Sequence, residues 1–415
     1  MKNIKKQDKE IYQMIKAELD RQKTGLVMIP SENFTSPAVL EAMASVLNNK
    51  YAEGYAKARY YTGNQFIDEI ETLAIERAKK LFGAEHANVQ PHSGTTANLA
   101  IYFALLKPGD KILSLNLAHG GHLSHGSKVS LVSQIYEIVH YNVDSKTNLL
   151  DYAEIKKIAQ AEKPQLIISG FSSYPRQIDF KKISEIAHEI GAYHLTDISH
   201  IAGLIIAGEH QNPFPDADVV MTTTHKTLRG PRSAIILCKK ELAAKIDKAV
   251  FPGTQGGPFE HIIAAKAVCF NEAMSDKFIT DQKQTVKNAQ ALAQTLIDNG
   301  ITLITGGTDT HLILIDCRTL KITGKEAAAV LAEVGIYTNA NVIPYDDNPP
   351  INPSGLRLGT PALTTQGMKE SEMKQIGQMI ADILKNPNDE NIKFQAKELV
   401  KKSTSQFSIY KDLKY

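Results

Sequence analysis

Apolar and polar positions succeed one another along the chain in a way that predicts alternating strands and helices. Short apolar runs indicate buried strands, and longer stretches with apolar residues every three or four positions indicate amphipathic helices. The strands predicted in the first two thirds of the chain are 86–90, 112–115, 135–143, 166–169, 192–196, 219–221 and 234–238, and the helices are 67–82, 99–106, 151–161 and 180–190. This succession favours parallel βαβ units, and we expect an α/β fold with a mostly parallel, seven-stranded sheet between helices.

The two ends of the chain show other patterns. Residues 4–21 place apolar side chains at helical spacing and predict an amphipathic N-terminal helix that needs a partner surface. Toward the C-terminus, helices are predicted at 281–299, 324–333 and 369–384, with strands at 302–305, 311–316 and 355–358. We therefore expect an N-terminal helical arm over residues 1–25, a large domain over 26–275 and a smaller C-terminal α+β domain over 276–415.

Composition narrows the class of protein without identifying its function. The 415 residues are 43% hydrophobic and 22% charged, which is typical of a soluble globular protein with more than one domain. A formal net charge of +2 gives no field that favours nucleic acid or an anionic membrane. Cys238, Cys269 and Cys317 lie far apart in apolar runs, so neither a disulfide framework nor a zinc site is predicted. With no export signal or membrane-spanning run in sight, we expect a cytoplasmic protein that binds small molecules.

Lys226 follows an apolar strand pattern and stands within the segment MTTTHKTLRGPR, residues 221–232. In open α/β sheets ligands gather outside the carboxyl ends of strands, and the turn after this strand would hold the amine there. A desolvated lysine loses its proton readily and can then form a Schiff base with an aldehyde. The alternative is a solvated surface lysine in a loop.

Asp197 closes the strand predicted at 192–196, so it should emerge at the same edge of the sheet as Lys226. A buried carboxylate needs a cationic or hydrogen-bonding partner, and the protonated pyridine nitrogen of pyridoxal phosphate is such a partner. His200, three residues further on, could reach the ring hydroxyl or a substrate carboxylate, or it could be an ordinary histidine at a turn.

Two further segments carry residue types that suit anionic groups. Ser93, Gly94 and Thr95 precede an apolar helix, where small hydroxyl residues and glycine can hold a phosphate; the alternative is an ordinary helix N-cap. Arg357 interrupts an apolar strand pattern, which suits bidentate capture of a carboxylate or, alternatively, an internal ion pair.

His119, His122 and His125 recur every third residue in LAHGGHLSHG, a spacing that could be interpreted as a metal site. The glycines at 120 and 121 indicate a loop instead of the continuous helix that such ligation needs, and no nearby carboxylate completes a ligand set. We therefore predict no metal, and an imidazole lying flat on an aromatic cofactor is the better use of one histidine. The chain has neither a complete phosphate-loop motif nor a GxG triplet, so nucleotide hydrolysis and dinucleotide binding are not predicted.

Taken together, these segments closely resemble the serine hydroxymethyltransferase family, pyridoxal-phosphate enzymes of the aspartate-aminotransferase-like fold, fold type I. The resemblance covers nearly the whole chain and rests on SENFTSPAVLEA, YAEGY, IERAKKLFGAEHANVQPHSG, LAHGGHLSHG, THKTLRGPR, VFPGTQGGP and GTPALTTQGM. It implies reversible transfer of the serine hydroxymethyl carbon to tetrahydrofolate, which gives glycine and 5,10-methylenetetrahydrofolate in one-carbon and amino-acid metabolism.

The resemblance also implies a role for each residue that matches a family motif. Lys226 matches the lysine that binds pyridoxal 5'-phosphate covalently, and Asp197 matches the partner of the pyridine nitrogen. The other implied catalytic and cofactor residues are Glu53 for proton transfer at the substrate hydroxyl, Tyr61 near it, His122 stacked on the ring, Ser172 and His200 near the ring hydroxyl, His225 beside the lysine, and Ser93, Gly94 and Thr95 at the phosphate.

Substrate, folate and subunit contacts follow from the same resemblance. Ser31 and Arg357, with Tyr61 and His200, are implied in binding the amino acid. The residues implied in folate binding are Leu117, Gly121, His122, Leu123, Asn341, Pro349, Pro350 and Ile351. We expect a homodimer, which could pair into a tetramer, with Tyr51 and Gly257 of the partner subunit completing each cofactor site.

Two other functions stay open. The chain departs from the common family motifs near the side-chain pocket and elsewhere, at Pro30, Ala56–Ala58, Thr62 and Ala340. One alternative is therefore a related enzyme that acts on α-methylserine or cleaves β-hydroxy amino acids as an aldolase. A non-catalytic RNA-binding protein is an alternative of another class, and the retention of all the bond-making residues argues against it.

Overall fold

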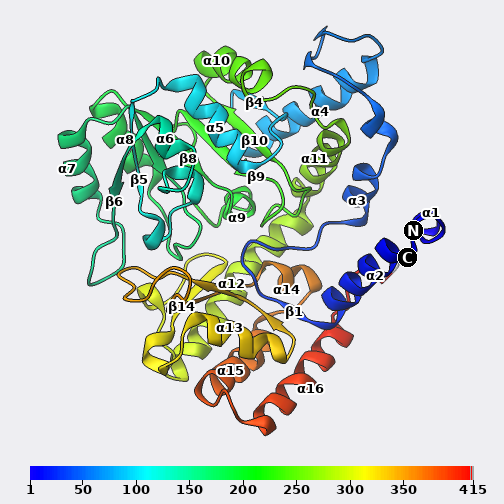
Figure 1. Ribbon diagram of the computed structural model, residues 1–415, viewed down its shortest axis with the longest axis vertical. Helices are drawn as coiled ribbons and strands as arrows, with labels where there is room; N and C mark the ends of the chain where they lie inside the picture. The colour runs from blue at the N-terminus through cyan, green and yellow to red at the C-terminus, as the bar shows by residue number, and fades with distance from the viewer. Residues whose placement is uncertain (412, 414–415) are drawn as a thin grey trace. The chain divides into compact units, whose positions relative to one another are not determined.

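The apolar runs between residues 86 and 238 form one seven-stranded sheet in the order β4-β10-β9-β8-β7-β5-β6 (Figure 1). Its strands are β4 (His86–Asn88), β5 (Lys111–Leu115), β6 (Glu137–Tyr141), β7 (Leu166–Ser169), β8 (Tyr193–Asp197), β9 (Val219–Thr223) and β10 (Ala234–Cys238). Neighbouring strands are parallel except for β10, which is antiparallel to β4 and β9. The mostly parallel, seven-stranded sheet expected from the sequence is confirmed.

The structure is a computed structural model that describes residues 1–411 and 413. Its contacts divide the chain into two units, one of residues Phe34–Lys283 and one of Met1–Asn33 with Gln284–Tyr415. The three-part division expected from the sequence, with breaks near residues 25 and 275, stays a prediction.

Helices surround the sheet in the unit of residues 34–283. They are α3 (Pro37–Met43), α4 (Gln65–Phe82), α5 (Gly94–Leu105), α6 (Val132–Ile135), α7 (Tyr152–Glu162), α8 (Phe180–Glu189), α9 (Ala202–Ile206), α10 (Ala243–Lys248) and α11 (Glu260–Ala273). Shorter turns and strands are η1 (Val46–Asn49), β2 (Gly54–Tyr55), β3 (Ala58–Arg59), η2 (Leu117–His119), η3 (Leu123–His125), η4 (Lys240–Leu242) and η5 (Ala249–Thr254). The 23-residue helix α12 (Asp276–Asp298) spans the boundary between the units.

Both faces of the central strands are buried, which explains the unbroken apolar runs at the start of β9 and through β10. Leu195 and Met221 pack in one cluster with Ile101 of α5. On the opposite face of β8, the His194 ring lies between two hydroxyls, with Nε2 2.7 Å from Ser169 Oγ and Nδ1 2.6 Å from Ser184 Oγ of α8. The core of the sheet therefore includes a hydrogen-bonded polar group that periodicity alone could not reveal.

We expect acid to weaken the fold through His194. Burial lowers the pKa of His194 to about 3, so the folded chain leaves the ring neutral at pH 5, where the unfolded chain binds the proton. The unfolded state thus holds more protons as the pH falls below about 6.5, and the free energy of unfolding should drop by about 2 kcal/mol between pH 7 and 5 from this residue. Denaturant unfolding followed by circular dichroism at both pH values measures the change. An equal drop in His194→Gln would contradict the assignment.

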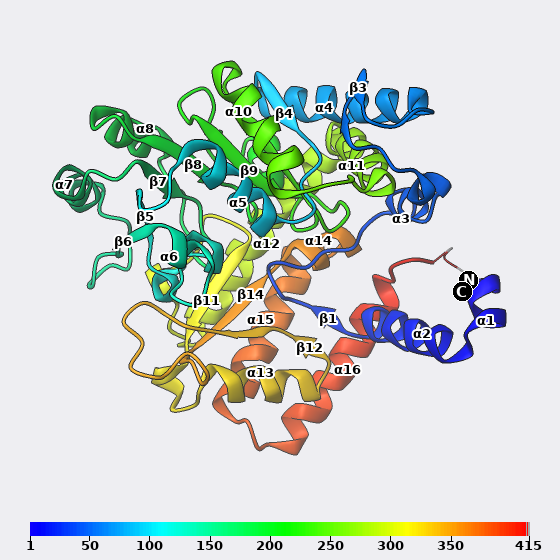
Figure 2. The ribbon, with the colours of Figure 1, turned by 45° about the horizontal axis from the view of Figure 1, so that its top comes forward.

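The unit of residues 1–33 and 284–415 is built on a small antiparallel sheet in the order β11-β14-β13. Figure 2 shows α13, α15 and α16 around this sheet. The elements are α1 (Lys2–Gln7), α2 (Lys9–Thr24), β1 (Leu26–Val27), η6 (Ile304–Gly306), β11 (Leu312–Asp316), η7 (Cys317–Leu320), α13 (Gly324–Glu333), β12 (Ile336–Tyr337), β13 (Asn339–Asn341), β14 (Gly355–Gly359), α14 (Pro361–Gln366), α15 (Glu370–Lys385) and α16 (Glu390–Gln406). β1 pairs with β12, which joins the N-terminal segment to this unit.

Several local predictions differ from the structure. The single N-terminal helix is two helices, because Asp8 has an extended backbone and caps α2 by accepting from Ile11 N at 3.0 Å. The strand predicted at 302–305 is wrong: only Leu303 bridges β11, and Thr305 has a φ of 64°, which ends extended structure. Helices α6, α9, α10, α11, α14 and α16 were not predicted, and the strand predicted from residue 135 begins only at Glu137, after α6. Helix α5 begins at Gly94 instead of residue 99.

Candidate active site

Lys226 lies in the turn that follows β9, and the residue is 9% exposed. Two hydrogen bonds close the turn on Thr224: Thr224 Oγ1 donates to Pro231 O, and Gly230 N donates to Thr224 O, both at 2.6 Å. Thr224 N also donates to Ser233 O at 3.0 Å. The turn therefore fixes the backbone around a buried amine just beyond the carboxyl end of β9, and Lys226 is not a solvated surface lysine.

Asp197 is the last residue of β8, which runs parallel to β9 with Asp197 opposite Met221. Because the two strands are neighbours, Asp197 and the turn of Lys226 emerge at the same edge of the sheet, as predicted from the sequence. Oδ1 of Asp197 accepts from Ser199 N at 3.0 Å, and Oδ2 lies 3.0 Å from His125 Nε2. The backbone of Gly170 passes so close that a Cβ there would collide with Asp197.

The carboxyl group of Asp197 stays ionised despite being only 7% exposed. Burial alone would raise its pKa, but the hydrogen bond from His125, together with the charge of Lys226, holds the pKa of Asp197 well below its usual range. A buried and ionised carboxylate is a suitable partner for a cationic nitrogen in a ligand.

The contact of His125 with Asp197 was not predicted from the sequence. Its backbone oxygen accepts from Ser114 Oγ at 2.6 Å, and its ring also lies 3.3 Å from Asn98 Nδ2 of α5. Because the Asp197 carboxylate can only accept, His125 Nε2 carries the proton in their contact. The sequence already predicted a buried carboxylate, Asp197, at the end of a strand. Such a carboxylate needs a hydrogen-bond donor, and a search for that donor could have identified His125.

His122 presents a neutral ring next to this pair. Its Nδ1 accepts from Ser124 N at 3.2 Å, which leaves the proton of the neutral ring on Nε2. Burial, helped by the charges of His125 and Lys226, lowers the pKa of His122 to about 4. An uncharged imidazole here can lie against an aromatic ring without adding a further cation to the site.

The three histidines of residues 117–126 serve different partners. His119 Nδ1 accepts from Val143 N at 3.3 Å, whereas His122 contacts Ser124 and His125 contacts Asp197. Among the residues that the structure describes, no group of three or more His, Cys, Asp and Glu side chains could hold a metal ion.

Ser93, Gly94 and Thr95 form the start of α5. Ser93 is the N-cap, and the capping box is complete: Thr96 N donates to Ser93 Oγ at 3.4 Å and Ser93 N donates to Thr96 Oγ1 at 3.0 Å. Within the described part of the chain, the N–H groups of Gly94 and Thr95 have no acceptor. The sequence left open whether this segment is a phosphate site or an ordinary helix N-cap. The two are compatible, because this N-cap leaves two N–H groups and the helix dipole available to an anion.

Gln255, which follows η5, is hydrogen-bonded to the segment between β4 and the start of α5. Its side chain accepts from His92 N at 2.9 Å and donates to Gln90 O at 3.0 Å. Next to it, the ring of Phe259 stacks on His92 with centroids 4.0 Å apart and planes at 8°. Sequence reasoning did not identify Gln255, which lies in an irregular stretch with no period.

Tyr51, Glu53, Tyr61 and Gly257 come together in a second cluster. The rings of Tyr51 and Tyr61 meet edge to face at 5.1 Å, and the charge of Glu53 raises the pKa of Tyr61. A Cβ on Gly257 would lie 3.2 Å from Tyr51 Cζ. A cavity of about 560 Å³ opens at this cluster and is lined by Glu53, Tyr60 and residues 251–256.

Arg59 fixes the backbone around Glu53. Its Nη1 donates to the carbonyls of Ala52 at 2.8 Å and Gly54 at 2.9 Å, the residues on either side of Glu53. Its Nη2 forms a 2.7 Å ion pair with Glu71 of α4, and both side chains are almost fully buried, with 3% and 1% exposed. Arg59 is a third residue that the sequence did not single out, since an arginine in a polar loop carries no periodic signal.

Ser172, His200 and His225 border the same sheet edge. Ser172 N donates to Gly120 O at 2.8 Å, and Thr227 Oγ1 donates to His200 O at 3.0 Å, which ties His200 to the lysine turn. Burial, followed by the charges of Arg232 and Lys226, lowers the pKa of His225 to about 3, so this ring is neutral beside the amine.

The unit of residues 1–33 and 284–415 carries Arg357 and Ser31. Arg357 lies in β14, where its Nε donates to Asn339 Oδ1 at 3.1 Å. Burial lowers the pKa of Arg357 to about 10, which still leaves the guanidinium protonated at neutral pH. A Cβ on Gly359 would lie 2.6 Å from Pro30 Cα, so the segment of Pro30 and Ser31 packs against the end of the same strand.

The residues implied in folate binding include unusually exposed apolar side chains. Leu117 and Leu123 are 41% and 53% exposed on η2 and η3, on either side of Gly121. Ile351 is 82% exposed in a loop that follows Asn341. Large apolar side chains that face solvent suit contact with a flat, largely apolar ligand.

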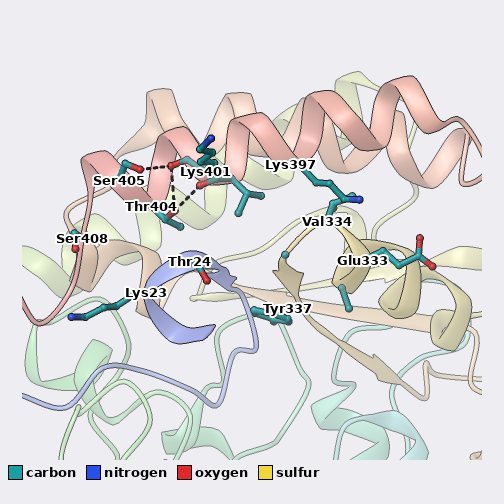
Figure 3. A pocket seen from close by; sticks show the side chains of 13 residues that line it. Lys23, Thr24, Glu333, Val334, Tyr337, Lys397, Lys401, Thr404, Ser405 and Ser408 are labelled. Atoms are coloured by element: carbon teal, nitrogen blue, oxygen red, sulfur yellow. Dashed lines mark hydrogen bonds between the residues drawn. The ribbon is translucent and has the colours of Figure 1, made fainter. Parts of the chain in front are cut away.

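A second cavity, of about 590 Å³, lies between the end of α2, β12 and α16. Figure 3 shows that the amines of Lys23, Lys397 and Lys401 point in three different directions there, so they do not converge on one anion. None of the predicted site residues lines this cavity.

Known proteins match this chain over nearly its whole length. Residues 4–380 match the protein family described as Serine hydroxymethyltransferase. The chain is similar to a serine hydroxymethyltransferase of Methanosarcina barkeri, with 53% identity over 411 residues that cover 99% of this chain and 100% of that protein. It is also similar to a serine hydroxymethyltransferase of Prochlorococcus marinus, with 54% identity over 411 residues that cover 99% of this chain and 97% of that protein.

Proposed function

Because the chain belongs to the serine hydroxymethyltransferase family, we propose that it transfers the hydroxymethyl carbon of serine to tetrahydrofolate in a reversible reaction. The products are glycine and 5,10-methylenetetrahydrofolate, so the enzyme acts in amino-acid and one-carbon metabolism. The observation that carries the proposal is the buried amine of Lys226 at the same sheet edge as the ionised carboxylate of Asp197. A nucleophilic amine and a buried anion are the two groups that a pyridoxal-phosphate enzyme requires.

Pyridoxal 5'-phosphate fits the residues at this edge. The N–H groups of Gly94 and Thr95, which have no acceptor in the described residues, would hold the phosphate at the start of α5. Asp197 would accept from the pyridine nitrogen and keep it protonated, and Lys226 would bind the aldehyde carbon. When bound, the cofactor supplies an electron-withdrawing ring that stabilises negative charge on the substrate Cα.

Other residues of the chain orient the substrates and move protons. Arg357 and Ser31 would bind the carboxylate of the amino acid, for which a protonated guanidinium is well suited. Glu53, with Tyr61 beside it, would accept and return the proton of the serine hydroxyl. His122 would cover one face of the cofactor ring with a neutral imidazole.

The same proposal assigns ring contacts near the sheet edge. Ser172 and His200 would lie near the cofactor hydroxyl, and His225 would stay neutral beside Lys226. Leu117 and Leu123 would contact the pteridine ring of folate from either side of Gly121, which their exposure supports. Asn341 and the loop residues Pro349, Pro350 and Ile351 would complete the folate site.

We propose a homodimer in which Tyr51 and Gly257 of the partner subunit complete each cofactor site. Tyr51 and Gly257 contact each other within this chain, so one subunit would contribute both residues to the cofactor site of the other. Large apolar side chains nearby remain open to solvent, including Tyr60 at 75% and Phe66 at 67% exposure, and a second copy of the chain would cover them. Among the described helices, none is both long enough and apolar enough to cross a membrane.

The test of this function is product formation from serine with and without tetrahydrofolate. We expect purified enzyme loaded with pyridoxal phosphate to form glycine and 5,10-methylenetetrahydrofolate, with serine turnover at least about a hundredfold slower when folate is omitted. Serine cleavage at the same rate without folate would favour a β-hydroxy amino acid aldolase. Turnover of α-methylserine in preference to serine would favour an α-methylserine hydroxymethyltransferase.

A further inference from the structure

The loop between β13 and β14 presents an apolar tip to solvent. It follows Asn341 and carries Pro349 and Pro350 ahead of Ile351, whose exposure is 82%. At its base the loop is anchored by Ile343, which is fully buried in a small cluster with Leu312 and neighbouring residues. An apolar tip outside the core cannot hold its own conformation by burial, so the shape of the loop must come from other contacts.

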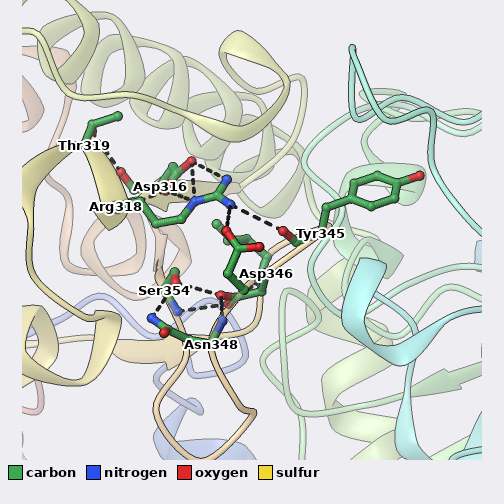
Figure 4. Close-up of polar contacts among 9 residues, drawn as sticks. Asp316, Arg318, Thr319, Tyr345, Asp346, Asn348 and Ser354 are labelled. Carbon is green, nitrogen blue, oxygen red and sulfur yellow. Dashed lines mark hydrogen bonds and ion pairs between the residues drawn. The ribbon is translucent and has the colours of Figure 1, made fainter.

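Those contacts converge on one carboxylate, Asp346 (Figure 4). Its Oδ2 accepts from Ser354 N at 2.9 Å and from Ile343 N at 3.4 Å. Its Oδ1 accepts from Ser354 Oγ at 2.6 Å and from Asn348 N at 3.0 Å. Asp346 therefore ties the beginning, middle and end of the loop together, and Asn348 Nδ2 reinforces the closure by donating to Ser354 Oγ at 2.9 Å.

The carboxylate is ionised in this arrangement. Burial alone would raise the pKa of Asp346, but the donors of Ser354, Asn348 and Ile343 lower it below its usual value. An ionised carboxylate can only accept hydrogen bonds, which matches a ring of four donors. An asparagine at position 346 would keep one acceptor oxygen. Its NH₂ group would take the place of the other oxygen and would face N–H or O–H groups that need an acceptor.

A second contact supports the loop from β11 and η7. Arg318 is held by Asp316, with Nη2 2.8 Å from Asp316 Oδ2, and its Nη1 donates to Tyr345 O at 3.3 Å (Figure 4). Tyr345 has a φ of 55°, a left-handed conformation that non-glycine residues rarely adopt. The backbone next to Asp346 is thus kept in an unfavourable conformation that a flexible loop would relax.

We propose that Asp346 is a positioning residue for tetrahydrofolate: it closes the loop of residues 342–354 so that the tip at 349–351 is ready for the ring of the cosubstrate. This inference rests on the proposed function, in which that tip contacts folate. Asp346 itself does not touch the ligand. A loop ordered before binding spares the ligand the cost of ordering it, so loss of the closure should weaken folate binding and leave the chemical step unchanged.

The test is a comparison of Asp346→Asn with Asp347→Asn in the holoenzyme. Asp347 carries the same charge one residue away, but its side chain is 89% exposed and it only approaches Arg318 at 3.4 Å. For Asp346→Asn we expect the KM for tetrahydrofolate to rise about tenfold, with kcat at saturating folate within about twofold and the affinity for glycine, read from the cofactor absorption, unchanged. For Asp347→Asn we expect all three quantities within about twofold of the unchanged enzyme.

Each outcome decides for or against the positioning role. Equal losses in folate KM and glycine affinity for Asp346→Asn, or no loss in either, would overturn it. If Asp346→Asn does not fold, Ser354→Ala removes the shortest of the four bonds, and it should raise the folate KM by about threefold without changing glycine affinity; an unchanged folate KM would then overturn the inference. If the unchanged enzyme makes no methylenetetrahydrofolate from serine, the proposed function fails, which is a distinguishable result.

Discussion

Replacing Lys226 by glutamine should reduce serine turnover at least about a thousandfold, because in the proposed function the amine of Lys226 would bind the cofactor aldehyde and the amide of glutamine could not. The glutamine side chain is close in size to lysine, so the closed turn around Thr224 should persist. Steady-state kinetics with serine and tetrahydrofolate measures the loss. Borohydride reduction of the unchanged enzyme, followed by peptide mapping, should place the cofactor on Lys226.

Lys266 is the matched control for the labelling experiment. It is also a buried lysine, 1% exposed, and burial lowers its pKa to about 7. Its amine, however, donates to the carbonyls of Val89 at 2.6 Å, Pro91 at 3.3 Å and Ala234 at 2.9 Å, which leaves no position for an aldehyde carbon. Label on Lys266, or unchanged turnover in Lys226→Gln, would remove the basis of the proposed chemistry.

Replacing Asp197 by asparagine should lower kcat for serine by about a hundredfold to a thousandfold. In the proposed function Asp197 would keep the pyridine nitrogen protonated, which an amide could not do, so the ring would stabilise negative charge on the substrate Cα poorly. The substitution also removes the ionised acceptor that His125 Nε2 contacts at 3.0 Å. We expect a shifted absorption maximum of the bound cofactor together with the loss of kcat.

Asp218→Asn is the control for this substitution. Asp218 is 8% exposed, close to the 7% of Asp197, and it too meets a histidine, with Oδ2 2.9 Å from His188 Nε2. It lies next to the start of β9, at the opposite end of the strand from the turn of Lys226. We expect Asp218→Asn to lower thermal stability while cofactor absorption and kcat stay close to normal. Equal losses of kcat in the two variants would mean that Asp197 acts through the fold and not through the cofactor.

The positions of three proposed site residues could be predicted from the sequence because each stands next to an element with a clear pattern. Asp197 and Lys226 follow buried strands, and Ser93 precedes an apolar helix, so the rule that strand ends meet at one edge was enough to bring them together. His125 and Arg59 could not be found in this way. Their roles depend on contacts across 72 and 12 residues of chain, with Asp197 and Glu71, which no local period encodes.

The sequence by itself determined the order of the elements, the parallel sheet and the edge at which the reactive side chains emerge, because hydrophobic periodicity and strand direction are local properties. Only the tertiary structure decided which polar groups are paired and charged. Asp197 stays ionised because His125 meets it, His122 stays neutral because burial removes water from its ring, and Asp346 organises its loop because four donors converge on it. Burial and hydrogen bonding between distant segments set these states, and both exist only once the chain has folded.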